Sequence, residues 1–351
     1  MNQYFENLNP LIKEYFGILS PEIPEFLGDY ICTPEMQRLG GISVACGTNY
    51  TNICDNEFFY SNLDHSIAVA LIIWNFTKDK KQTLAGLFHD ISTPVFKHCI
   101  DFMNGDYETQ ESTEELTSKM ISESPEIMKW LKRDGIAVYE IQDYHMYPIA
   151  DNDTPQLSSD RLEYTFTNGL GVRKKIWDLE KVKCIYENIE ILQNEEGIPE
   201  LGFSDVKLAE EFACTALELG KEYIKNEIKL TMQFLADTVK KMIDKELLTK
   251  KDLYILSERE VIRRIENCGD EVIMRSFRLF RKATGIGESD EPVLDKYCVS
   301  INNAKRRYIV PLVKVNGKVK RVTEVSDVVK QKVQEFLSWE TKKYAYLDFN
   351  F

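Results

Sequence analysis

The sequence predicts an all-α body with a small α+β segment at its C-terminal end. Apolar residues recur at helical spacing through most of the chain, which favours helices over strands. The pattern changes after a loop expected near residues 283–292, where two short apolar runs flank Asn316-Gly317, a dipeptide typical of tight hairpin turns. We therefore expect a helical body over residues 1–290 and an α+β segment over residues 291–351.

Helical segments can be placed in order along the chain. Helices are expected over residues 64–77, 82–90, 95–103, 111–122, 174–194, 204–224, 225–247, 247–266 and 325–342, with strands over 306–313 and 318–325. The first helix, DHSIAVALIIWNFT, is apolar almost throughout, so we expect it to be buried. Pro94 separates the second helix from the third, because proline disfavours helical conformation in the residue before it. Residues 151–160 are expected to form a loop that leads into a helix near Asp160.

Length and charge limit the classes of function. The 351 residues, 43% apolar and 29% charged, allow about two domains or one large domain. The chain carries 44 basic and 57 acidic residues, for a net charge of −13. Such an acidic chain is a poor general binder of nucleic acid or of anionic membranes, although it is compatible with a small basic pocket for a phosphorylated ligand. No run of apolar residues is long enough to predict a membrane span.

Cysteine usage indicates a reducing compartment. None of the eight cysteines forms a CxxC pair, so neither a zinc ribbon nor a thioredoxin-like motif is supported. The first residues lack the basic start and apolar run of a secretory signal. We therefore expect a cytoplasmic protein in which most cysteines are small, buried apolar residues.

Three of the four histidines, His65, His89 and His98, lie close together in the apolar helical region. Asp90 follows His89 directly, and at the end of a helix both side chains can converge on an ion held between helices. His65 opens another helix and supplies a third ligand. Two imidazoles and a carboxylate suit a divalent transition metal that keeps positions open for water and substrate. A fourth ligand has to come from a distant acid.

Three motifs carry a resemblance to a known family. YSNLDHS at 60–66, GLFHD at 86–90 and SSDRLEYT at 158–165 resemble the HD-domain metal-dependent phosphohydrolases, most closely the branch that includes dNTP triphosphohydrolases. The resemblance covers roughly residues 20–290 and implies an HD-domain, phosphodiesterase-like helical core. It also implies one divalent ion (Fe, Mn, Zn or Ni). The ligands it implies are His65, His89, Asp90 and Asp160.

The same resemblance implies a substrate-binding set. In DRLEY, Arg161 and Tyr164 would face a nucleotide phosphate or sugar, and Arg38 in the motif QRL would contact the ligand. Thr93 and Thr109 stand where the family's triphosphohydrolases usually have catalytic histidine or glutamate residues. Other positions that contact the nucleotide in the family are also altered, for they are Val44, Asn62 and Asn168 here. The metal-binding pattern is therefore intact, whereas the residues that would recognise a dNTP differ.

The leading hypothesis is a metal-dependent phosphohydrolase that acts on a nucleotide or another phosphate ester. Asp90 would bind the ion and help to activate water, while His98 or Glu111 would assist the leaving group. The alternative is a catalytically weakened HD-domain protein that binds metal and nucleotide as a regulatory module. A third hypothesis is a structural helical protein with an empty site. The resemblance also implies a homo-oligomer.

Several of these residues have simpler roles open to them. Asp160 also suits a helix N-cap, Arg161 a structural ion pair, and His98 a hydrogen bond to the backbone. His145 is expected in a surface loop. The basic run Lys305-Arg306-Arg307 is expected to form a solvated face or an interface rather than a nucleic-acid contact.

Overall fold

The computed structural model describes residues 3–6, 8–54, 56–110 and 116–351. The α-helices are α1 (Gln3–Glu6), α2 (Pro10–Leu19), α3 (Glu25–Ile31), α4 (Pro34–Arg38), α5 (Asn62–Thr77), α6 (Lys80–Phe88), α7 (His98–Asn104), α8 (Thr117–Glu123), α9 (Pro125–Asp134), α10 (Ser159–Gly169), α11 (Leu179–Tyr186), α12 (Val206–Tyr223), α13 (Asn226–Asp244), α14 (Glu258–Glu266), α15 (Glu271–Lys282) and α16 (Asp327–Ser338). The strands are β1 (Ile189–Gln193), β2 (Pro199–Phe203), β3 (Gly287–Ser289), β4 (Tyr297–Val299), β5 (Leu312–Val315), β6 (Lys318–Arg321) and β7 (Tyr344–Leu347). The fold is mainly helical, as predicted, and it also contains two small sheets.

Helices α5 and α6 form an antiparallel pair at the centre of the larger core. Ser61 and Asp64 form a capping box at the start of α5, which satisfies backbone N–H groups that a helix leaves free. Residues 62–73 of α5 are all buried, as the apolar run predicts. Only Lys78 and Asp79 connect the two helices, and Asp79 caps α6. This short connection brings the start of α5 next to the end of α6, where the candidate metal ligands lie.

The predicted helix over residues 174–194 is wrong in its second half. Helix α11 ends before β1, and β1 pairs with β2 as an antiparallel hairpin. The Asn194 side chain accepts hydrogen bonds from the backbone N–H groups of Glu196 and Ile198, and Gly197 has a positive φ of 75°. This turn chemistry reverses the chain, and a periodicity argument does not detect it.

Other boundaries also differ. The helix expected over 95–103 starts at His98, because Phe96 and Lys97 have positive φ values of 64° and 44°, outside the helical region. The helix expected over 247–266 divides into a short 3₁₀ turn and α14. Helix α15 and strand β3 lie where no helix or strand was expected. The first part of the helix expected over 111–122 lies outside the described residues.

The predicted hairpin around Asn316-Gly317 is confirmed as β5 and β6. Both turn residues have positive φ, as this tight turn requires. Strand β5 also pairs in parallel with β2, which gives one sheet the order β1-β2-β5-β6, and the other sheet has the order β3-β7-β4. Both sheets therefore join strands from either side of residue 290, and the division into two domains at that point stays a prediction.

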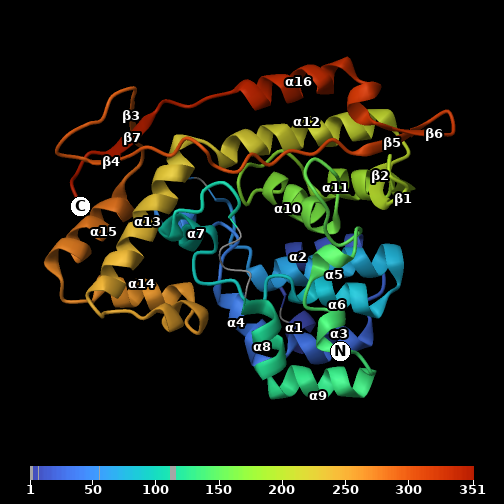
Figure 1. Ribbon diagram of the computed structural model, residues 1–351, viewed down its shortest axis with the longest axis horizontal. Coiled ribbons are helices and arrows are strands. Elements are labelled where there is room, and N and C mark those ends of the chain that lie inside the picture. Colours follow the sequence, from blue (N-terminus) through green and yellow to red (C-terminus); the bar gives the residue numbers. More distant parts are fainter. Residues whose placement is uncertain (1–2, 7, 55, 111–115) are drawn as a thin grey trace.

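Two packed groups of helices make up the molecule (Figure 1). One contains α2, α5, α6, α10 and α12, and the other contains α7, α13, α14 and α15. The C-terminal residues run across both groups, from the sheet of β3, β4 and β7 to the hairpin of β5 and β6 (Figure 1). In the second group, the rings of Phe234 and Phe280 stack with centroids 4.5 Å apart.

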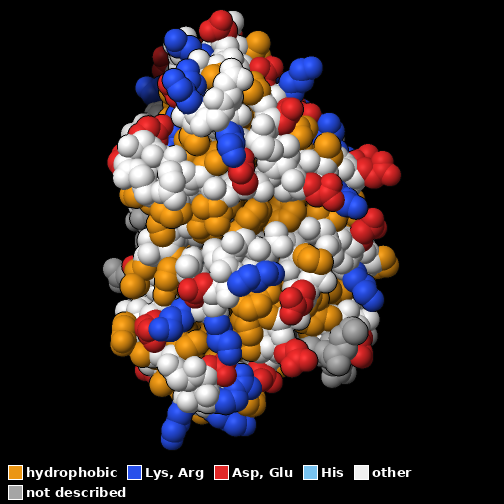
Figure 2. Space-filling view, turned by 90° about the vertical axis from the view of Figure 1, so that its right-hand side faces the viewer, with side chains coloured by type: hydrophobic (Ala, Val, Ile, Leu, Met, Phe, Trp, Pro, Cys, Tyr) orange, Lys and Arg blue, Asp and Glu red, His pale blue; other side chains and the backbone are white. Residues whose placement is uncertain are grey.

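Charged side chains of both signs are interspersed on the face seen in Figure 2, where a band of hydrophobic side chains crosses the middle. Among the described helices, none has both the length and the apolar character that a bilayer span requires.

The C-terminal segment packs closely on α12 at Gly220, so a larger side chain at this position should destabilise the protein. A Cβ at Gly220 would lie 2.4 Å from the carbonyl oxygen of Arg307, so Gly220→Ala is expected to destabilise the protein by about 1–3 kcal/mol in urea unfolding. Gly17→Ala is the matched control, because Gly17 is exposed in α2 and its Cβ would meet nothing within 4 Å. That variant is expected to gain roughly 0.5–1 kcal/mol. Equal stability of Gly220→Ala and wild type would contradict the packing.

Candidate metal centre

The four predicted ligands come from three helix ends. His65 lies in the first turn of α5, and His89 and Asp90 follow the last residue of α6. Asp160 is the second residue of α10, whose N-cap is Ser158. The alternative role of Asp160 as the helix cap is therefore excluded.

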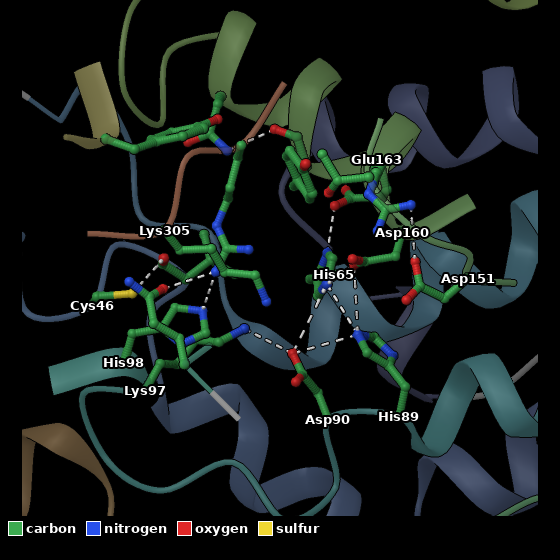
Figure 3. Close-up of a pocket in the computed structure, with 18 of the residues that line it drawn as sticks. Cys46, His65, His89, Asp90, Lys97, His98, Asp151, Asp160, Glu163 and Lys305 are labelled. Atoms are coloured by element: carbon green, nitrogen blue, oxygen red, sulfur yellow. Dashed lines mark hydrogen bonds and ion pairs between the residues drawn. The ribbon is translucent and has the colours of Figure 1, made fainter. Parts of the chain in front are cut away.

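The donor atoms of these residues face one another (Figure 3). The Nε2 atoms of His65 and His89 are 3.2 Å apart, and Asp160 Oδ1 is 3.1 Å and 3.7 Å from them. Asp90 Oδ2 lies 3.9 Å from His65 Nε2 and 3.5 Å from His89 Nε2. Ligands about 2.1 Å from one ion are separated by roughly 3.0–3.4 Å at right or tetrahedral angles. The 3.1 Å and 3.2 Å spacings lie in this range, and the remaining three are longer, so His65, His89 and Asp160 form a group that could hold a metal ion.

The Nδ1 atoms of His65 and His89 contact other partners, so both Nε2 atoms are available to bind an ion. His89 Nδ1 donates to the carbonyl oxygen of Gly86 at 2.7 Å, and His65 Nδ1 lies against the carboxylate of Glu163. With the hydrogen on each Nδ1, two Nε2 lone pairs point at each other beside two carboxylates. Such an arrangement is stabilised by a cation between them, and metal-bound histidines are held by the same kind of outer hydrogen bonds.

Glu163 is a residue of the candidate site that the sequence analysis did not single out. It is fully buried, and besides His65 its carboxylate accepts hydrogen bonds from Tyr60 Oη at 2.8 Å and Tyr15 Oη at 3.4 Å. Glu163 follows Asp160 by three residues, and this spacing puts both carboxylates on one face of α10. The spacing can be read from the sequence and could have pointed to Glu163. Glu163 therefore orients His65 and supplies negative charge behind it.

The charges around the imidazoles favour a positive charge at this point. Burial lowers the pKa of His65, but Glu163 and Asp160 outweigh it and raise the pKa to about 10. Burial raises the pKa of Asp90, but Lys97 and the two histidines hold it well below its usual range. The pKa of Asp160 is also lowered, because the histidines outweigh its burial. The site therefore keeps its carboxylates ionised, as cation ligands must be.

Lys97 is a second residue that the sequence did not reveal. Its Nζ donates to Asp90 Oδ2 at 2.7 Å and to Asn62 Oδ1 at 2.6 Å. Thr93 donates to the other carboxylate oxygen of Asp90 at 3.0 Å, so this threonine orients a candidate ligand instead of acting as an acid. The backbone has positive φ at Phe96 and Lys97, and this turn directs the lysine toward Asp90. No sequence pattern predicts the turn.

A cavity of about 380 Å³ opens onto these donors, large enough for a small organic ligand. Its lining contains these predicted site residues: His65, His89, Asp90, His98, Asp160, Arg161 and Tyr164. Arg161 donates to Asn152 and lies 3.6 Å from Asp151, so it makes the structural ion pair that was its alternative role. Glu111 lies outside the described residues.

Arg38 takes a different position from the one expected. Its guanidinium donates to the carbonyl oxygens of Ile91 at 3.0 Å and Thr93 at 2.8 Å, and it is not among the residues that line the described cavity. Burial lowers its pKa to about 10. Arg38 thus holds the turn after Asp90, which positions the candidate ligand rather than a substrate.

His98 lines the cavity but faces other partners. Its Nδ1 lies 2.9 Å from Asp101, and its Nε2 lies 3.4 Å from a guanidinium nitrogen of Arg307. Lys305 and Arg307 also line the cavity, whereas Arg306 turns away to the carbonyl oxygens of Phe336 and Trp339. The run Lys305-Arg306-Arg307 was expected to form a solvated face or an interface, and two of its three residues instead line the cavity.

The environment of His98 gives a pH-dependent prediction. Burial lowers its pKa, and Arg307 adds to this effect while Asp101 opposes it. Below about pH 6.5 the unfolded chain binds a proton at this histidine more readily than the folded protein does, so acidification favours unfolding. From pH 7.5 to 5.5 we expect wild type to lose more stability than His98→Gln in urea titrations. Parallel stability curves for the two proteins would contradict the burial of a neutral imidazole.

No family model matches the chain. It is 22% identical over 326 residues to the uncharacterized protein YdhJ of Bacillus subtilis, across 92% of this chain and 94% of that protein. It is 25% identical over 162 residues to the metal-dependent phosphohydrolase cns2 of Cordyceps militaris, across 44% of each chain.

Solved structures share the fold. A hypothetical protein from Aquifex aeolicus superposes with a TM-score of 0.65 at 17% identity, over 93% of both chains. A phosphohydrolase from Bacteroides thetaiotaomicron superposes with a TM-score of 0.61 at 14% identity, over 93% of this chain and 96% of that one. The relative and the neighbour that carry the name phosphohydrolase, together with the cluster of His65, His89 and Asp160, fit a metal-dependent phosphohydrolase.

Proposed function

We propose that this protein is a metal-dependent phosphohydrolase that uses a single divalent ion held by His65, His89, Asp90 and Asp160. The observation that carries the proposal is the pair of imidazole Nε2 atoms 3.2 Å apart, with Asp160 Oδ1 beside them and each Nδ1 bonded elsewhere. A structural zinc site would close its coordination with protein ligands, whereas this one opens onto a cavity.

Hydrolysis forms a bond from the oxygen of water to phosphorus, breaks the ester P–O bond and delivers a proton to the leaving oxygen. When bound, a divalent ion polarises a phosphoryl oxygen and lowers the pKa of a coordinated water. Glu163 keeps the Nε2 atom of His65 aimed at the cavity, and Thr93 and Lys97 fix the carboxylate of Asp90. Lys97 also lines the cavity, where its positive charge would attract the negative charge of a phosphoryl group.

The proposed substrate is a nucleotide or another small phosphate ester. Tyr144, Tyr164 and Tyr223 line the cavity and offer apolar faces for a base or another organic group. His98 is on the side of the cavity away from His65, so its position favours a contact with the ligand over proton delivery at the metal centre (Figure 3). The role of leaving-group acid stays a prediction for Glu111.

The regulatory alternative has one observation in its favour. Thr93, which stands where a catalytic acid or base was expected, is used to orient Asp90. A protein of this kind would hold a metal and a phosphorylated ligand without turnover. Metal analysis followed by an assay of ester hydrolysis separates this binding module from the hydrolase.

The test is elemental analysis of tag-free protein, followed by a panel of nucleotides and phosphate esters assayed with the metal found. We expect about one divalent ion per chain and release of phosphate from at least one class of ester. His145→Ala is the matched control for metal content, because His145 is an exposed histidine outside the cluster. Metal without any turnover would favour the binding module, and a metal-free protein after reconstitution would exclude both.

A further inference from the structure

The cavity has two chemically different ends. Figure 3 shows Cys46 and His98 on one side and His65 and His89 on the other. The acidic lining residues labelled there, Asp90, Asp151, Asp160 and Glu163, all lie on the side of the two metal-binding candidates. The side of Cys46 and His98 therefore differs in charge from the acidic side that holds the candidate metal ligands.

Two arginines lie at that opposite end. Arg173 is beside Cys46, since its guanidinium donates to Thr48 Oγ1 at 2.6 Å and to the carbonyl oxygen of Ala45 at 3.1 Å. Both acceptors are neutral, and within the described parts of the chain no carboxylate lies in ion-pair distance of Arg173. The side chain is only half-exposed, so water screens its charge incompletely.

Arg307 reaches the same end from the C-terminal segment. It donates to Gln110 Oε1 at 2.9 Å and lies 3.4 Å from His98 Nε2, again without a carboxylate partner among the residues described. Half-buried guanidinium groups ordinarily pair with carboxylates, and this chain contains 57 aspartate and glutamate residues. Among the residues that the structure describes, these two cations have only neutral partners, and an anionic ligand in the cavity would complement both charges.

The hydroxyl group of Tyr223 is an independent observation. It lines the cavity, is buried, and has no hydrogen-bond partner in the part of the chain that the structure describes. Burial and the neighbouring Tyr164 raise the pKa of this phenol, whereas Arg173 and Arg307, which line the same cavity, both act to lower it. An unpaired buried donor costs about 1–3 kcal/mol, so a ligand oxygen would satisfy it.

We propose that Arg173, Arg307 and the Tyr223 hydroxyl bind a second phosphoryl group of the substrate, whose first phosphoryl group lies at the metal centre. The inference deepens the proposed function and rests on it for the position of the first group. Because the two ends lie on opposite sides of the cavity, the substrate class is an ester with phosphoryl groups on two different carbons. Guanidinium groups suit this role, since they donate two parallel hydrogen bonds to a phosphate.

The subsite itself is tested on metal-free protein in EDTA, with inorganic phosphate as the probe and binding followed by ³¹P NMR. Arg173→Gln and Arg307→Gln are each expected to weaken binding about tenfold, as loss of one charge-assisted contact implies. Tyr223→Phe removes only the hydroxyl and is expected to weaken binding a few-fold while the fold is retained. Arg278→Gln, at an exposed arginine of α15, is the matched control and should bind as wild type does. Wild-type affinity in both arginine variants would overturn the subsite.

The substrate class is tested on metal-loaded protein with matched pairs of esters. Adenosine 3′,5′-bisphosphate is compared with adenosine 5′-monophosphate, and fructose 1,6-bisphosphate with fructose 6-phosphate. We expect kcat/KM at least about tenfold higher for the bisphosphate of one pair, and loss of that preference in Arg307→Gln. Equal values for both members of each pair, or a preference for ADP over both bisphosphates, would overturn this class. Phosphate binding without hydrolysis of any ester would sink the phosphohydrolase proposal and leave the anion subsite standing.

Discussion

Replacing Asp160 with alanine is expected to lower kcat/KM for phosphate ester hydrolysis by about a thousandfold or more. The carboxylate lies 3.1 Å and 3.7 Å from the two imidazole Nε2 atoms, so its removal would take away one of the four proposed ligands, the one nearest to both histidines. Lewis-acid stabilisation of a phosphoryl group contributes several kcal/mol, and about 4 kcal/mol corresponds to a factor of a thousand. The measurement is steady-state hydrolysis together with metal content by elemental analysis.

The matched control for this variant is Asp143→Ala, because Asp143 is an exposed carboxylate that pairs only with the exposed His145 among the described residues. It should retain the metal and the activity. Asp160→Ala should also lose the stabilisation that metal gives wild type, which reaches about 2.7 kcal/mol at a hundred times the dissociation constant. A full complement of metal in Asp160→Ala would show that this aspartate is not a ligand.

Glu163→Gln is expected to weaken metal binding about 10–100-fold, measured by competition with a chelator of known affinity. The carboxylate is fully buried against His65 Nδ1 and also accepts hydrogen bonds from Tyr60 and Tyr15. Glutamine keeps the volume and can still accept from the imidazole, but it removes the negative charge that makes the His65 ring a stronger ligand. The expected change is therefore in affinity, with little change in the fold.

Glu163→Ala should instead destabilise the protein by about 3–5 kcal/mol, because it leaves two buried tyrosine hydroxyls and an imidazole without their acceptor. Glu180→Gln, at an exposed glutamate of α11, is the matched control and should change neither quantity. Wild-type metal affinity in Glu163→Gln would mean that Glu163 supports packing alone.

Much of the helical framework could be predicted from local signals. The apolar run of α5 needs burial on every face, and Asn316-Gly317 specifies its own turn, so neither depends on distant residues. The clustering of His65, His89 and Asp90 also follows from short-range facts, since a two-residue connection returns α6 along α5. The periodicity argument failed at β1, inside the helix expected over residues 174–194, where the turn at Asn194 and Gly197 and the pairing with β2 decide the conformation.

The sequence by itself determined which residue types are available for a metal and roughly where the helices that carry them begin and end. Only the tertiary structure decided that Glu163 lies behind His65, that Lys97 pairs with Asp90, and that Arg38 turns to backbone carbonyls. It also decided that Arg307, more than two hundred residues beyond His98, faces the same cavity. The physical reason is the sequence range over which each interaction acts. Caps, turns and apolar periodicity depend on residues a few positions apart. The partner of a buried charge depends instead on packing between helices and on backbone turns such as the one at Phe96 and Lys97.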